Sequence, residues 1–117
     1  MLAARSSAAF ATFPAFQQRA ERSFDELCGE VIGERTDYLY GPFLLKSVLV
    51  AELAAADASV GWGWRPFLFN VARARSYRIV SISGDSACPI DQRGDEERVH
   101  RLRQLSENAD GLARSCR

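Results

Sequence analysis

The chain has 117 residues, of which 47% are hydrophobic and 26% are charged, and its 15 basic residues balance 15 acidic ones. This length favours one domain, and the composition is that of an ordinary globular protein rather than a disordered or fibrous one. A net charge of zero disfavours a free-standing nucleic-acid-binding protein, and three widely spaced cysteines are too few for a disulfide-stabilised scaffold.

The N-terminal segment, residues 1–12, has the composition of a mitochondrial targeting sequence. It contains an arginine and two serines, and the first acidic residue of the chain is Glu21. Stretches that contain Arg and Ser and lack acids are typical of such presequences. We therefore expect residues 1–12 to be a targeting-like extension that is retained, and residues 13–117 to form a single small α-rich domain. The hypothesis is that the large apolar side chains of residues 1–13 pack into a partner: Leu2, Phe10 and Phe13.

The first predicted helix covers residues 13–32. Thr12 is a candidate N-cap, Pro14 suits the first helical turn, and Gly33 is a candidate stop. Apolar residues recur at helical spacing and predict the buried stripe: Phe16, Ala20, Phe24, Leu27 and Val31.

The second predicted helix covers residues 42–58 and begins near Pro42. From Phe43 to Val50 the residues are apolar on nearly all sides, so we expect this helix to be largely buried. A membrane span is disfavoured because charged residues interrupt the apolar run: Lys46, Glu52 and Asp57.

One short strand or hairpin is predicted within residues 62–83. The β-branched residues before Gly84 are typical of a strand that ends there. Because one strand cannot form a sheet alone, it pairs either with residues 62–70 or with a partner's sheet. In a different reading of the same segment, Pro66 begins a short helix.

The last predicted helix covers residues 95–113. Asp95 is its candidate N-cap, and the acidic Glu96 and Glu97 suit its first turn. Its apolar stripe is Val99, Leu102, Leu105, Ala109 and Leu112. The fold class that these elements predict is mainly α, with α+β as the alternative.

Aromatic residues and arginines are interleaved within residues 62–78, which makes this segment the candidate interface. Trp, Tyr and Arg are enriched in the hot spots of protein interfaces, and Trp and Arg also settle against anionic lipid headgroups. In the alternative reading, the aromatics form core and the arginines face water. A preceding acidic block, residues 21–57 with eight acids and three bases, disfavours nucleic-acid stacking. The candidate residues are Trp62, Trp64, Arg65, Phe67, Phe69, Arg73, Arg75, Tyr77 and Arg78.

No catalytic, cofactor or metal site is predicted. His100 is the only histidine, and the cysteines lack the closely spaced pairs that are typical of zinc sites: Cys28, Cys88 and Cys116. The serine after Gly84 and Asp85 lacks the surroundings that a catalytic triad needs.

Taken together, these observations predict a non-catalytic accessory subunit of a mitochondrial inner-membrane complex, such as a respiratory-chain complex or ATP synthase. The chain would lie peripheral to the membrane and have a structural or assembly role. Its partners would be other protein subunits and, at the membrane surface, anionic lipid headgroups. One alternative is a small soluble enzyme or ligand-binding protein that uses Cys88, Asp91 and His100 near a pocket. Another is a mitochondrial ribosomal protein.

Overall fold

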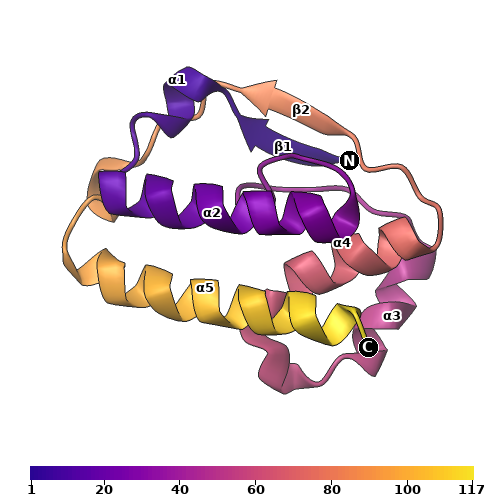
Figure 1. The fold of residues 1–117 in the computed structure, drawn as a ribbon. Coiled ribbons are helices and arrows are strands. Elements are labelled where there is room, and N and C mark those ends of the chain that lie inside the picture. Colours follow the sequence, from indigo (N-terminus) through magenta and orange to yellow (C-terminus); the bar gives the residue numbers. More distant parts are fainter.

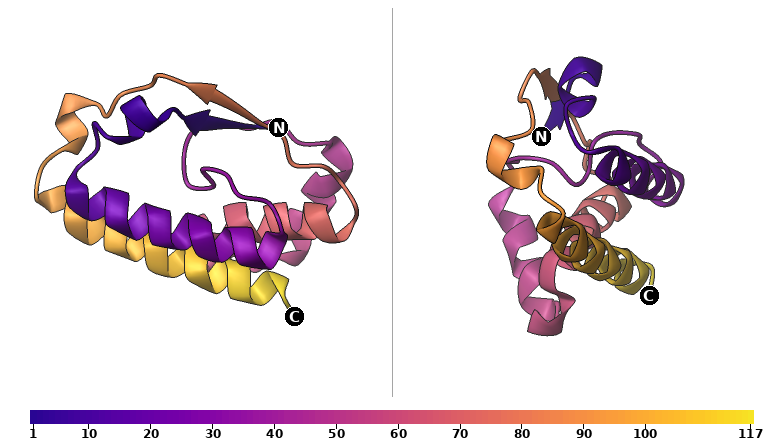
Figure 2. Two further views of the ribbon diagram at one scale, coloured as in Figure 1. Left: turned by 45° about the horizontal axis from the view of Figure 1, so that its top comes forward. Right: turned by 90° about the vertical axis from the view of Figure 1, so that its left-hand side faces the viewer.

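Two long helices, α2 (Ala15–Ile32) and α5 (Glu96–Ser115), lie side by side and run in the same direction (Figures 1 and 2). The structure, a computed structural model, describes all 117 residues. Helix α4 (Trp64–Ala74) packs on α5, and a two-stranded sheet lies on the other side of α2 together with the short helix α1 (Ser7–Phe10). The mainly α fold class and helices near both ends of the chain are confirmed.

The sheet joins the N-terminus to the second half of the chain. Strand β1 (Leu2–Arg5) pairs in parallel with β2 (Ser81–Gly84), so that Leu2 lies opposite Ser81. The predicted strand that ends at Gly84 is therefore confirmed. Its partner is β1 rather than residues 62–70, because most of that segment belongs to α4.

The helix expected over residues 42–58 forms only in part. A 3₁₀ turn (Ser47–Leu49) leads into the short helix α3 (Val50–Ala55), which has no buried residue. The residues before it are extended because they bond to the N-terminus: the Leu44 N–H donates to the Met1 carbonyl at 2.7 Å, and the Met1 ammonium donates to the Leu44 carbonyl at 2.8 Å. The expectation of a largely buried helix is wrong here, since pairing with the first strand competes with helix formation.

Helix α2 ends at Gly33, whose φ of 81° is the left-handed conformation that the predicted stop requires. Its buried face is only partly the predicted one. Phe24 is buried as expected, but Leu27 is 46% exposed and Val31 is also exposed. The face turned inward carries these residues instead: Gln17, Glu21, Phe24, Cys28 and Ile32. The physical reason is that Glu21 pairs with a buried arginine from β1.

Helix α5 begins where predicted, although the Asp95 side chain pairs with Arg98 at 3.1 Å and caps no backbone N–H. Of the predicted stripe, Leu112 is buried and Leu105 is half-buried. The prediction is wrong for the other three residues, which are exposed: Val99, Leu102 and Ala109. Gly111 lets α5 cross the start of α4 closely. A Cβ added there would lie 1.9 Å from the Gly63 carbonyl oxygen.

The main core brings the N-terminal segment into contact with three helices and the loop after α2. Its buried members are Leu2, Phe24, Cys28, Ile32, Tyr38, Phe69 and Leu112. The hypothesis that the N-terminal apolar side chains pack into a partner is wrong for Leu2 and Phe13, since both are buried in this chain. Phe10 is half-buried, with its ring 4.7 Å from the Arg5 guanidinium.

Candidate functional site

A buried arginine anchors the first strand to α2 and to the loop that follows it. The Arg5 Nε and Nη2 donate to the two carboxylate oxygens of Asp37 at 2.7 and 2.8 Å, and Nη2 also donates to Glu21 at 2.6 Å. Burial by itself lowers the pKa of Arg5, but the bonds and charges of Asp37 and Glu21 outweigh it and the pKa is raised. Three aromatic rings lie 4.5–4.9 Å from its guanidinium carbon: Phe10, Phe13 and Tyr40.

A third carboxylate lies beside this cluster. The Asp25 carboxylate accepts the Tyr38 N–H at 2.9 Å. Burial, followed by the negative charge of Asp37, raises the pKa of Asp25 to about 8. The main physical reason is that burial disfavours the charged form of the carboxyl group, and the negative charges of Asp37 and Glu21 act in the same direction. Asp25 is therefore mostly protonated at neutral pH.

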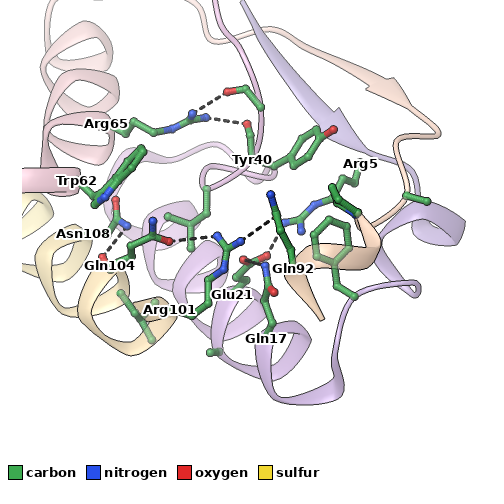
Figure 3. A pocket seen from close by; sticks show the side chains of 17 residues that line it. Arg5, Gln17, Glu21, Tyr40, Trp62, Arg65, Gln92, Arg101, Gln104 and Asn108 are labelled. Atoms are coloured by element: carbon green, nitrogen blue, oxygen red, sulfur yellow. Dashed lines mark hydrogen bonds and ion pairs between the residues drawn. The ribbon is translucent and has the colours of Figure 1, made fainter. Parts of the chain in front are cut away.

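Next to this cluster is a cavity of about 340 Å³ between α2, α5 and two loops, which we call the polar cavity (Figure 3). Its wall combines three arginines, a glutamate and four side-chain amides with aromatic and apolar groups. The lining residues are Arg5, Phe13, Gln17, Ala20, Glu21, Leu39, Tyr40, Gly41, Trp62, Arg65, Ala87, Pro89, Gln92, Arg101, Gln104, Leu105 and Asn108.

Helix α5 supplies the polar wall from residues that share one helical face (Figure 3). The Arg101 guanidinium donates to the side-chain oxygens of Gln104 and Gln92, both at 3.1 Å. Its Nε has no hydrogen-bond partner, and the nearest carboxylate oxygen, on Glu97, is 3.7 Å away. Asn108 donates its amide to the Gln104 carbonyl at 2.8 Å, while its Oδ1 is buried without a partner.

Arg65 shapes the opposite wall by holding the loop of residues 38–41. Its three nitrogens donate to the carbonyls of Tyr38, Tyr40 and Gly41 at 2.7–3.1 Å. No carboxylate pairs with this guanidinium, and burial lowers its pKa. A residue expected at a surface thus shapes the backbone that lines the cavity.

The structure separates the nine predicted interface residues rather than gathering them on one face. Arg65 and Phe69 are buried, while Trp64, Phe67 and Tyr77 are half-buried. The remaining residues are exposed: Trp62, Arg73, Arg75 and Arg78. Trp62 lines the polar cavity, and Arg75 pairs with Glu52 of α3.

A second surface feature lies beside the sheet. Two adjoining hollows of about 320 and 410 Å³ share Met1 and Leu44, and we call them together the apolar groove. Leu44 is 68% exposed and Ile82 of β2 is 57% exposed. Further groove residues come from α4 and the segment after it: Leu68, Ala72, Tyr77, Arg78 and Ile79.

The residues of the alternative enzyme hypothesis do not meet in either feature. Cys88 is buried, with its N–H donating to the Thr12 hydroxyl at 2.8 Å, and His100 lies on the exposed side of α5, where it contacts Gln104. Neither residue, nor Asp91, lines the polar cavity or the apolar groove. No three potential ligands among His, Cys, Asp and Glu are arranged to hold a metal ion. No helix combines the length and apolar character needed to cross a bilayer.

Apart from Trp62 and Arg65, which are predicted interface residues, the sequence did not point to the residues of the polar cavity. The available signal was the presence of polar residues on otherwise apolar helical faces. Gln17 and Glu21 continue the line of Phe24 toward the start of α2, and Gln104 and Asn108 continue the line of Leu112 in α5.

Comparison of the chain with protein-family models, with characterised proteins and with solved structures finds no match. The function is therefore argued from the residues and their arrangement.

Proposed function

We propose that this chain is a non-catalytic accessory subunit of a larger protein assembly and that the apolar groove contacts a neighbouring subunit. The observation that carries the proposal is the groove itself. Eight or nine hydrophobic residues line each of its hollows, and side chains as large as Leu44 and Ile82 are mostly exposed there. Continuous apolar surface of this kind is typical of interaction sites.

The sheet supports the same proposal. All four residues of β2 are exposed. Parallel strands are ordinarily covered on both faces, and a sheet of two strands is marginal in water. A neighbouring subunit that covers Ile82 and Leu44 would supply the missing apolar contact.

The solvent-accessible surface of the chain also supports a contact with a neighbouring subunit. A monomer of this mass is expected to expose about 6,300 Å². The chain of 13.0 kDa exposes 7107 Å². The excess is comparable with the area that one partner loses in a standard interface, about 800 Å².

Arginines beside the groove suggest the chemistry of the partner. Arg78 lines the groove, and Arg73 is exposed on the neighbouring helix. Neither forms an ion pair within the chain. They would meet acidic residues of a neighbouring subunit or anionic lipid headgroups.

We propose further that the assembly is a mitochondrial inner-membrane complex, such as a respiratory-chain complex or ATP synthase, with this chain peripheral to the membrane. The support is the acid-free composition of residues 1–20. Because Leu2 and Arg5 belong to the folded interior, a targeting role for this segment requires that it stays attached.

The test is native electrophoresis of the C-terminally tagged chain after gentle detergent extraction from its source cells. We expect migration with a large complex, loss of that complex in Ile82→Glu, and retention in Ile90→Glu. Ile90 is the matched control because it is 86% exposed and lies outside the groove. Migration as a free species near 13.0 kDa would overturn the subunit proposal.

Cell fractionation tests the finer proposal separately. Recovery with the inner membrane at low salt supports it, and a cytosolic location contradicts the mitochondrial part while leaving the groove proposal intact. Salt-sensitive co-sedimentation with ribosomes would instead favour the ribosomal alternative.

A further inference from the structure

The polar cavity has hydrogen-bonding capacity that the chain does not use. Asn108 is 5% exposed, and its buried Oδ1 accepts no hydrogen bond. Arg101, which lies seven residues earlier on the same face of α5, has an unpaired Nε. Buried polar groups are almost always paired, so two unpaired groups in one cavity indicate a site for another molecule.

The charges around the cavity specify the sign of that molecule. Arg5 is compensated by Glu21 and Asp37, and Glu21 also accepts the Gln17 amide at 2.6 Å. Those carboxylates therefore have little capacity for a cationic ligand. In contrast, the hydrogen bonds of Arg101 go to neutral amide oxygens, and its ion pair with Glu97 is long, with 3.7 Å between Nε and Oε2, so a ligand carboxylate could bond more closely to its guanidinium.

The spacing of the two unpaired groups specifies the length of that molecule. The Cα atoms of Arg101 and Asn108 lie about 10 Å apart along the axis of α5, so a ligand that contacts both side chains extends along this helix face. Apolar and aromatic groups also line the cavity, among them Leu105 of α5. Trp62 contributes its ring from the segment before α4 (Figure 3). The volume of about 340 Å³ lies in the range of small-molecule sites.

We propose that the polar cavity binds an elongated small carboxylate. Its carboxylate bonds to Arg101, a hydroxyl or N–H at its far end donates to Asn108 Oδ1, and its flat apolar body lies against Leu105 and Trp62. This site is independent of the apolar groove, with which it shares only Tyr40 among its lining residues.

The test is calorimetric titration of the full chain with three matched probes. The first, 3-(4-hydroxyphenyl)propanoate, carries a carboxylate, a ring and a distal hydroxyl. The second, 3-phenylpropanoate, lacks the hydroxyl, and the third, 4-(3-hydroxypropyl)phenol, lacks the carboxylate. We expect the first probe to bind about 10-fold more tightly than the second and about 10- to 100-fold more tightly than the third.

Variants on α5 assign the contacts. Arg101→Gln removes the preference for the carboxylate, and Asn108→Leu makes the first two probes bind equally. Arg98→Gln is the matched control because Arg98 is exposed and does not line the cavity, so all three affinities stay unchanged. Circular dichroism verifies the fold of each variant.

Asn108→Asp provides a second test that keeps the size of the side chain. The carboxylate introduced at this position still accepts a hydrogen bond from the distal hydroxyl, so the first probe should keep its preference over the second, in contrast to Asn108→Leu. No saturable binding of the first probe up to about 10 mM would overturn the proposal, because affinity that weak indicates only non-specific contact. Unchanged affinities for the three probes in Arg101→Gln and Asn108→Leu would also overturn it.

Discussion

The paired helices α2 and α5 bury different chemistry at their two ends. Toward their amino ends they enclose polar groups, including Glu21 from α2 and Gln104 from α5 (Figure 3). Toward their carboxyl ends they pack apolar side chains into the main core, including Phe24, Ile32 and Leu112. The same two helices thus form both a core and a cavity.

This difference indicates which end of the helix pair stabilises the fold and which end has polar groups without hydrogen-bond partners. Burial of apolar surface stabilises without strict geometry, so the carboxyl ends hold the helices together. At the amino ends, each buried charge must find a partner, and the attraction between Arg5, Glu21 and Asp37 is largely offset by their loss of hydration. The polar end therefore adds less net stability than its number of ion pairs suggests, and its Asn108 Oδ1 has no hydrogen-bond partner within the chain.

The largest expected effect comes from breaking the apolar end. Phe24→Ala should lower the free energy of unfolding by about 3–5 kcal/mol, because it opens a cavity in the main core. Leu27→Ala, one turn along the same helix but exposed, should cost less than about 1 kcal/mol. Urea unfolding measures both changes, and equal losses would mean that α2 is rotated differently.

The next largest effect is expected from a substitution in the ion-pair network at the amino ends of the two helices. Arg5→Met keeps much of the side-chain volume but leaves Glu21 and Asp37 without their cation, and should cost about 3 kcal/mol. Arg103→Ala, which removes an exposed arginine paired with Glu107 at 3.4 Å, should cost less than about 1 kcal/mol. The comparison uses thermal and urea unfolding at neutral pH, and similar costs for the two variants would contradict a buried network.

The next prediction concerns the close contact between α5 and the start of α4, at Gly111 and Gly63. Gly111→Ala forces a methyl group onto the Gly63 carbonyl and should destabilise the chain by about 1–3 kcal/mol. Gly94→Ala meets no atom within 4 Å and should change stability by no more than about 0.5 kcal/mol. A neutral Gly111→Ala in chemical unfolding would show that the helices cross farther apart.

The smallest effect per pH unit concerns the electrostatics of the polar end. Because the pKa of Asp25 is raised to about 8 in the folded state, folding takes up a proton between the unfolded pKa and this value. Asp25 therefore stabilises the fold at low pH, and this contribution falls by up to about 1.4 kcal/mol per pH unit as the pH rises toward 8.

Asp25→Asn retains an acceptor for the Tyr38 N–H and removes this titration. The stability of the unmodified chain relative to this variant should therefore decline from pH 4 to pH 8, as the pH rises to the folded-state pKa of about 8. Equilibrium unfolding across this range measures the difference. A difference that stays constant, or one that grows with pH, would contradict the burial of this carboxyl.

Local signals in the chain predict most of the regular structure. The helical spacing in α2, the left-handed stop at Gly33 and the acidic first turn of α5 act within a few residues, so the sequence alone places both long helices. The strand that ends at Gly84 is recognisable for the same reason. These features depend on backbone propensity and hydrophobic periodicity, which need no distant partner.

Only the tertiary structure decided which helical faces are buried and where the cavity lies. The Arg5 network joins residues separated by 16 and 32 positions, and it turns Glu21 inward at the expense of the Leu27 and Val31 stripe. Pairing of β1 with β2 and with residues near Leu44 likewise limits the helix expected from residue 42. Ion pairs and strand pairing between distant segments leave no periodic trace in the sequence, and for this reason the sequence determined the elements while the fold determined the site.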